Sequence, residues 1–142
     1  SHALTCTPDL YHVDPCYVEV KFDSRTPVMA TKENCQDAAE KTAHAHGFDF
    51  ETPGMIPPHR VAADSEFVQK LLRAYEQVTG LKGEAMAIGG GTYVHDIKNG
   101  VAFGAVLPGI DTHMHGADEF FDLENIVLAT KVYAEAIIEL CS

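Results

Sequence analysis

Residues 17–23 read YVEVKFD, a stretch in which apolar and charged side chains alternate. Side chains of a β-strand point alternately to its two faces, so this period of two predicts a strand with one buried face. Residues 3–13 form a weaker strand candidate, and the intervening Asp14-Pro15 is typical of a turn. The beginning of the chain is therefore predicted to form a β-hairpin.

A helix with a packing face of small side chains is predicted to follow the hairpin. Thr31 is a suitable N-cap, the helix would run to about His46, and Gly47 would end it. Its inward face would carry Cys35, Ala38, Ala39, Thr42 and His46. Residues 48–50 would begin a further short strand ahead of the proline-rich connection at 53–58.

Two more helices and two more strands are predicted in the rest of the chain. Asp64 is a suitable N-cap for a helix that Gly80 would end, apolar runs at 85–88 and 101–107 indicate strands, and the last helix would begin at about Asp122. The expected buried stripes are Phe67, Val68, Leu71, Leu72, Tyr75 and Val78 in the first of these helices, and Leu123, Ile126, Val127, Thr130, Tyr133, Ile137 and Leu140 in the second.

The predicted element order gives an α/β chain of the α+β type in two parts. Residues 1–62 are expected to form strand, strand, helix and strand, and residues 63–142 helix, strand, strand and helix. We place the boundary near residues 61–65, where the composition changes after the prolines.

Composition and charge exclude several classes of function. Of the 142 residues 46% are apolar, and the net charge is −11 with histidine neutral. Such an acidic surface repels phosphate backbones and anionic lipids, which argues against nucleic acid and membranes as partners. The four cysteines form no CxxC pair, which favours reduced, mostly buried thiols. No apolar run reaches the roughly 18 residues of a membrane span and no leader is visible, so a cytoplasmic protein is expected.

Residues 111–119, DTHMHGADE, form the richest cluster of potential chemistry. Imidazole is a good zinc ligand, and His113 and His115 would face the same way if this segment were extended. Zinc sites need three or four protein ligands, however, and no other spaced set of histidines or cysteines is visible. Ordinary surface histidines therefore remain an alternative to a metal site.

Two further features have both a functional and a structural interpretation. Residues 89–92, GGGT, follow a predicted strand, and glycines there allow a ligand to approach the backbone, although a tight structural turn explains them as well. Arg25 follows the alternating strand and has the planar fork that binds carboxylates, or it is an exposed arginine paired with Asp23.

Taken in order, several motifs resemble the C-terminal signature of the bacterial dipeptidase V family, which belongs to the aminoacylase, carboxypeptidase G and carnosinase group of metallopeptidases. The motifs are KFDSRTP at 21–27, AIGGGTY at 87–93, VAFG at 101–104, LPG at 107–109, HGADE at 115–119 and VYAEAI at 132–137. The resemblance covers nearly the whole chain and is sharpest from Asp64 onward. Met114 and the pair Val94-His95 depart from the residues common in that family, which affects the expected substrate preference.

The resemblance implies a catalytic α/β domain with two zinc ions, interrupted by a ferredoxin-like lid. Residues 1–62 would be the second half of the lid, and residues 63–142 the C-terminal part of the catalytic domain. His115 would be a zinc ligand, oriented by Asp118 or Glu119, and Arg25 would grip the substrate. The glycine loop that lines the substrate site corresponds to Gly90, Gly91 and Thr92.

The resemblance also implies that most of the chemistry lies elsewhere. In the family the remaining metal ligands and the catalytic carboxylate precede the lid, so no catalytic residue is assigned in this chain and the isolated chain is expected to be inactive. The leading hypothesis is a C-terminal fragment of a zinc-dependent dipeptidase acting on dipeptides or short peptides, with cobalt or manganese as other metals. The alternatives are a binding or dimerisation module that pairs through an exposed sheet edge, and a mononuclear metal-binding protein that uses His113 and His115. Apolar faces left uncovered are expected to promote self-association.

Overall fold

A computed structural model describes residues 3–104 and 106–142 of the chain, which divides into two compact units. The first unit comprises residues 3–60 and 87–91, and the second comprises the described residues of 61–86 and 92–142. Each unit contains helices, and the first also contains a two-stranded antiparallel sheet. The predicted α+β class is confirmed.

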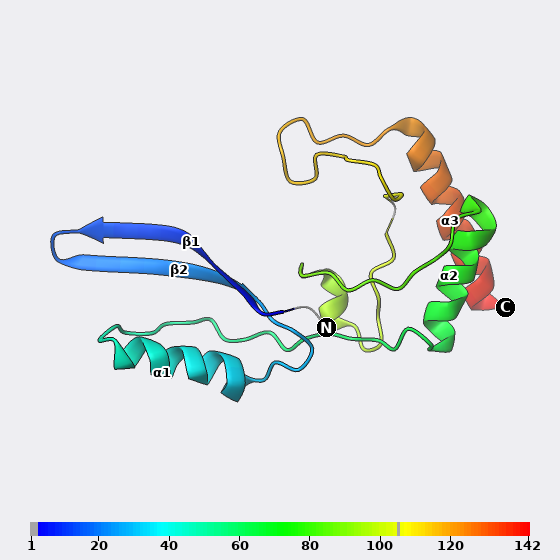
Figure 1. Ribbon diagram of the computed structural model, residues 1–142. Coiled ribbons are helices and arrows are strands. Elements are labelled where there is room, and N and C mark those ends of the chain that lie inside the picture. Colours follow the sequence, from blue (N-terminus) through cyan, green and yellow to red (C-terminus); the bar gives the residue numbers. More distant parts are fainter. Residues whose placement is uncertain (1–2, 105) are drawn as a thin grey trace. The chain divides into compact units, whose positions relative to one another are not determined.

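The hairpin of the first unit has the predicted position. Strands β1 (Thr5–Asp14) and β2 (Tyr17–Arg25) pair antiparallel, with Asp14 opposite Tyr17 at the turn and Thr5 opposite Arg25 at the open end (Figure 1). The Asp14 carboxylate accepts a hydrogen bond of 2.8 Å from the Cys16 amide, which closes the turn. The register shifts between residues 8 and 10, where proline removes a donor from the ladder.

The apolar face of this hairpin is not buried, contrary to the prediction from its alternating pattern. Val18 and Phe22 are exposed and Val20 is only partly covered. Strand β1 is exposed along its whole length. The physical reason is that two strands alone form a narrow ribbon, which needs a further layer to bury a face.

The first helix begins and ends as predicted, but a different face is covered. Thr31 caps it through its hydroxyl, which accepts from the Asn34 amide, and the π-helical turn η1 (Lys32–Gln36) leads into α1 (Asp37–Ala45). Gly47 follows with φ +78°, the left-handed conformation that ends helices. The expected inward residues Ala38, Ala39, Thr42 and His46 are exposed, while Cys35, Asp37, Glu40 and Ala43 are partly covered.

Helices α2 (Glu66–Thr79) and α3 (Leu123–Cys141) form the core of the second unit and lie side by side (Figure 1). Ser65, rather than Asp64, caps α2, and Gly80 ends it with φ +68°. The seam buries Leu71, Ala74 and Ala136, with Val101 and Phe103 packed against them. The predicted stripe of α2 is covered except at Phe67, which is 38% exposed.

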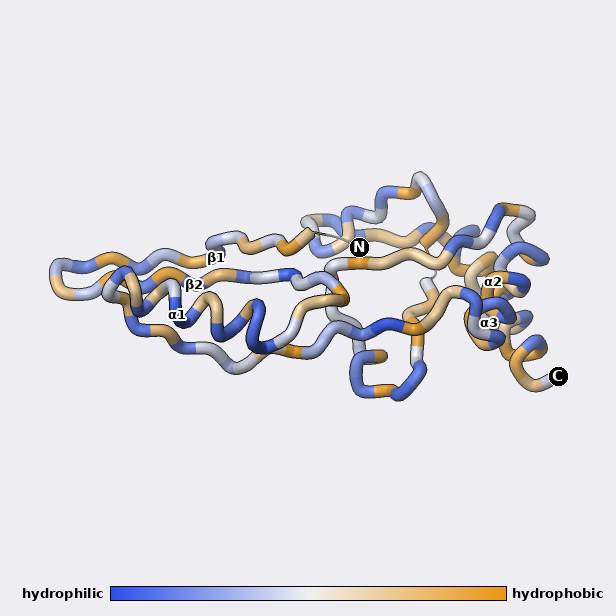
Figure 2. The backbone as a smooth tube through the Cα atoms, turned by 60° about the horizontal axis from the view of Figure 1, so that its bottom comes forward, coloured by the Kyte–Doolittle hydropathy of each residue, from blue (hydrophilic) through white to orange (hydrophobic). Residues whose placement is uncertain are grey.

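The stripe predicted to be the buried face of α3 is exposed. Hydrophobic residues recur along the whole of α3 (Figure 2), so the sequence pattern does not select one face. Val132 and Ala136 are buried, Ala136 in the cluster with Leu71 and Ala74 of α2, whereas Ile137 is 63% and Leu123 is 78% exposed. The exposed residues of α3 include the charged Glu124 and Lys131. Seven uncharged exposed residues are called the α3 outer face below: Leu123, Ile126, Val127, Thr130, Ala134, Ile137 and Ile138.

Several predicted strands and buried thiols are not found in the described residues. Residues 48–50 and 85–88 are irregular, and so are the described residues of 101–107; Ala105 lies outside the described residues. No disulfide joins the four cysteines, as expected, but Cys6, Cys16 and Cys141 are exposed rather than buried. Among the helices of the described residues, none has the length and apolar character needed to cross a bilayer.

Candidate functional site

The histidine-rich segment forms a closed loop ahead of α3. Thr112 is buried, and its carbonyl accepts a hydrogen bond of 3.0 Å from the Phe120 amide, which joins the two ends of the loop. The His113 carbonyl accepts from the Gly116 amide at 2.7 Å, and the His113 amide donates to the Asp111 carboxylate at 2.9 Å. Residues 113–116 therefore make a tight turn instead of the extended segment in which two histidines would face the same way.

Left-handed backbone conformations are concentrated in this loop. His113, His115 and Asp118 have φ of 55°, 63° and 56°. Residues with a Cβ adopt this region at a cost in free energy, and such strain collects at functional sites. In the described residues, the other non-glycine residue of this kind is Asn99.

The two histidines of the loop have different surroundings. The His113 ring meets the edge of the Phe120 ring, with centroids 5.5 Å apart and planes at 85°. His115, Asp118 and Glu119 are exposed, and among the described contacts none joins either carboxylate to the His115 ring. No group of three histidine, cysteine or acidic side chains that could hold a metal ion occurs within residues 3–104 and 106–142. The donors among the described residues therefore do not make a complete metal site by themselves.

Arg25 lies at the end of β2, in the first unit. Its guanidinium donates to the Asp23 carboxylate at 2.7 Å, and both side chains are about half exposed. The structure thus contains the Arg25–Asp23 ion pair that the sequence offered as the alternative to a substrate-binding role. The exposed arginine retains further N–H donors, because a guanidinium carries five.

The glycine segment passes next to Arg25 within the same unit. A Cβ on Gly89 would lie 3.7 Å from Arg25 Cγ, whereas a Cβ on Gly90 or Gly91 would meet nothing within 4 Å. Two features more than 60 positions apart in sequence are thus adjacent, with open space beside two of the glycines. The chain bends at Gly89 and Gly90, which agrees with the structural alternative, and none of the three glycines has a positive φ.

Thr92 belongs to the second unit and has a local structural role. It precedes the 3₁₀ turn η2 (Tyr93–Asp96), and the His95 ring nitrogen lies 3.0 Å from its carbonyl and 3.4 Å from its amide. His95 therefore takes part in the hydrogen bonding of this turn.

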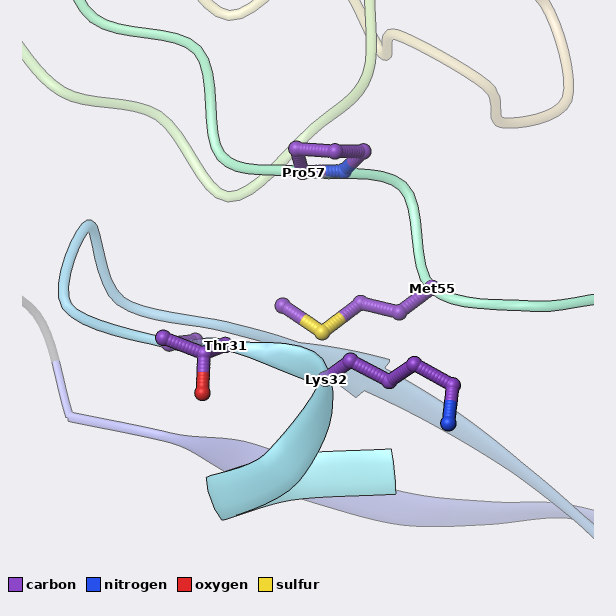
Figure 3. A pocket seen from close by; sticks show the side chains of 5 residues that line it. Thr31, Lys32, Met55 and Pro57 are labelled. Carbon is purple, nitrogen blue, oxygen red and sulfur yellow. The ribbon is translucent and has the colours of Figure 1, made fainter. Parts of the chain in front are cut away.

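A separate pocket of about 250 Å³ contains none of the predicted site residues (Figure 3). It is lined by Ala30, Thr31, Lys32, Met55 and Pro57. The Lys32 amine is bound to the Asp37 carboxylate at 2.5 Å, and this hydrogen bond raises the pKa of Lys32. The mostly apolar lining and the paired lysine give this pocket no evident chemistry.

Comparison with known proteins places these features in a family. The model of the peptidase family M20/M25/M40 matches residues 5–139, which include both Arg25 and the His115 loop. The chain belongs to this family of peptidases. Members of the M20 family are generally metal-dependent hydrolases.

The M20 relatives include proteins whose names specify dipeptidases. The chain is 42% identical over 101 residues to "Putative dipeptidase SH1171" of Staphylococcus haemolyticus, covering 71% of this chain and 22% of the relative. It is 35% identical over 122 residues to "Putative dipeptidase YtjP" of Bacillus subtilis, covering 86% and 26%. A protein of Staphylococcus aureus, "Putative dipeptidase SAUSA300_1697", is 37% identical over 109 residues, covering 77% and 23%. The chain thus spans about a quarter of the length of these relatives.

Sequence reasoning missed two residues of this site. The Phe120 ring contacts the His113 ring, and Thr112 is buried at the start of the loop. Neither residue belongs to a periodic pattern, because Phe120 directly follows Asp118-Glu119 and Thr112 lies between polar neighbours. Only the hydrogen bond that closes the loop identifies them.

Proposed function

We propose that this chain is the C-terminal portion of a zinc-dependent dipeptidase that hydrolyses dipeptides or short peptides. The observation that carries the proposal is the family match over residues 5–139, together with relatives named as dipeptidases. Residues 1–62 would belong to the lid and residues 63–142 to the catalytic domain.

His115 would be the zinc ligand that this chain contributes. Its exposed imidazole, held in a strained and closed loop, supports this role. Because zinc takes three or four protein ligands, the other donors would come from parts of the intact protein that correspond to the rest of its longer relatives. Asp118 or Glu119 would accept a hydrogen bond from the second ring nitrogen of His115 and fix its orientation. Two bound zinc ions, or cobalt or manganese in their place, would supply an activated water.

Arg25 and the glycine segment would bind the peptide. The fork of Arg25 suits a substrate carboxylate or the negative charge that develops on the reacting carbonyl. The open space beside Gly90 and Gly91 would admit a peptide backbone, with Thr92 at its end. Support for this role comes from the proximity of the two predicted binding elements, because a Cβ added to Gly89 would lie 3.7 Å from Arg25 Cγ.

The chain alone would be inactive, because its described residues contain no group of side chains that could hold a metal ion and it has no assigned catalytic base. Incubating the purified chain with zinc and a panel of dipeptides is expected to release no amino acids. Hydrolysis by the isolated chain would refute this division of the chemistry.

The decisive experiment uses the intact protein, with the sequence that precedes this chain in its gene. His115→Ala is expected to lower kcat/KM for dipeptides more than about 100-fold. His44→Ala, which changes an exposed histidine at the end of α1, is the matched control and leaves kcat/KM unchanged. Arg25→Lys is expected to raise KM, because an ammonium lacks the bidentate fork. Full activity of His115→Ala would exclude the assignment.

A second candidate, an association module, is favoured by the exposed surface of the chain. Its accessible area is 11067 Å², whereas two separate compact domains of these sizes would expose about 8,700 Å². The seven residues of the α3 outer face are uncharged, with the exposed Glu124 and Lys131 on the same helix, and this apolar surface suits a second copy of this chain. Pro8 and the bulge blunt the edge of β1, so sheet pairing is the less favoured route.

Sedimentation equilibrium tests this candidate. Ile137→Asp on the α3 outer face is expected to weaken dimerisation and reduce the binding of hydrophobic dyes, while Ile56→Asp, another exposed isoleucine, has little effect on either. A concentration-independent monomer with the dye binding of an ordinary domain would exclude the module.

A further inference from the structure

The loop from Thr112 to Phe120 is closed by contacts between its own residues. One backbone hydrogen bond joins its ends, a second closes the inner turn at Gly116, and the rings of His113 and Phe120 meet edge to face. The inner turn has little room, because a Cβ on Gly116 would lie 3.0 Å from the His113 carbonyl oxygen. These contacts oppose the cost of keeping His113 and His115 in left-handed conformations.

The loop is also fixed to a packed helix. Two residues after Phe120, the Asp122 carboxylate accepts from the Asn125 amide at 2.9 Å and caps α3. α3 in turn packs on α2 through Ala136. At the other end of the loop, Thr112 is buried. His115 therefore lies on a short loop whose two ends are both anchored, as a positioned functional side chain requires.

We propose that His113 and Phe120 are positioning residues that hold the His115 turn in shape. In this arrangement the two histidines of the HxH motif have separate tasks: the His113 ring is a brace against Phe120, and the His115 ring is presented outward. The loop-closing role of His113 and Phe120 does not depend on the proposed function. Only the metal-binding role of the exposed His115 ring rests on the proposed function.

Amide hydrogen exchange in the 142-residue chain tests the brace without any metal or activity. The Gly116 and Phe120 amides, which donate to carbonyls in the loop, are expected to exchange more slowly than the Met114 amide. Removing the aromatic edge in Phe120→Leu should speed exchange at both amides roughly two- to tenfold, measured relative to the Val132 amide in α3. Phe120→Tyr retains the ring and should restore the protection.

A pair of substitutions at His113 distinguishes the ring from the backbone. His113→Phe keeps an aromatic brace, whereas His113→Asn keeps a residue tolerant of positive φ but removes the ring. The proposal expects slow exchange at Gly116 and Phe120 in His113→Phe and fast exchange in His113→Asn. Equal exchange in the wild type and all four variants would overturn the proposal. Slow exchange at the Gly116 and Phe120 amides in His113→Asn, with fast exchange in His113→Phe, would also overturn it.

In the intact protein the same substitutions separate this inference from the dipeptidase proposal. Phe120→Leu should weaken zinc affinity, measured by competition with a chromogenic chelator, and lower kcat with little change in KM. His113→Phe should retain most of the zinc affinity, and His115→Phe should lose it. If exchange responds as expected but His115→Phe binds zinc normally, the brace stands and the metal role of His115 falls. If exchange does not respond, the brace falls and the dipeptidase proposal is unaffected.

Discussion

The same substitution at two neighbouring positions of α3 tests which face of the helix is buried. Ala136 is 4% exposed and contacts Leu71 and Ala74, whereas Ala134, half a turn away, is exposed. We predict that Ala136→Asp strongly destabilises the chain and that Ala134→Asp does so only slightly. The buried stripe predicted from the sequence includes Thr130 and Ile137, which lie next to Ala134 on the same face of the helix. If that stripe were buried, Ala134→Asp would destabilise the chain more than Ala136→Asp.

The expected difference follows from burial. Both variants lose helix propensity, which costs about 0.5–0.7 kcal/mol for alanine to aspartate. At position 136 the carboxylate must also leave water for the seam between two helices, and an unpaired buried charge carries an effective penalty of several kcal/mol. Neutralisation of the carboxyl group reduces this penalty, so we expect Ala136→Asp to cost at least about 2 kcal/mol more than Ala134→Asp, or roughly 30-fold in the folding equilibrium.

Urea unfolding followed by circular dichroism at 222 nm measures both free energies. The two variants share helix, substituted residue and added charge, so helix propensity and net charge cancel in the comparison. The protein concentration should be low, because Ala134 also belongs to the α3 outer face and its substitution would disturb self-association. Equal destabilisation, or greater destabilisation by Ala134→Asp, would show that α3 does not pack on α2 as described.

Three further predictions concern local structure. Tyr133→Phe removes the hydroxyl that donates to the Phe103 carbonyl at 3.0 Å but keeps the edge contact of the two rings, and should lower the unfolding free energy by about 1 kcal/mol; no change in urea unfolding would contradict this contribution. Gly80→Ala places a Cβ at φ +68° and should lower the unfolding free energy by about 1 kcal/mol. Gly104→Ala is the control and should be nearly neutral, because this position has open space and an ordinary φ. Equal melting temperatures of the two variants would be evidence against the left-handed cap. The pKa of Glu33 lies below its ordinary 4.5, because its own backbone amide and the N-cap hydroxyl donate to the carboxylate. Ionised Glu33 therefore stabilises the helix above pH 4.5, and this contribution is lost as the pH falls through the lowered pKa; an NMR titration of its side-chain carbon with a midpoint at or above 4.5 would contradict it.

The sequence by itself determined the local elements of this protein. The alternating residues 17–23 and the turn at Asp14-Pro15 fixed the hairpin, because alternation and turn chemistry act within a few residues. Thr31, Gly47, Gly80 and Asp122 marked helix ends for the same reason: capping bonds and left-handed glycines are local. The ordered motifs also sufficed to identify the family.

Only the tertiary structure decided which surfaces meet. α3 is apolar around most of its circumference, so its sequence is compatible with burial of either face. Packing against α2 selected the face that carries Ala136. Among the candidate functional residues, the sequence marked His115 in one unit and Arg25 and the glycines in the other. It did not mark Phe120 or the proximity of Gly89 to Arg25. The first contact depends on how the loop closes and the second on two distant segments meeting. Neither produces a periodic pattern in the sequence.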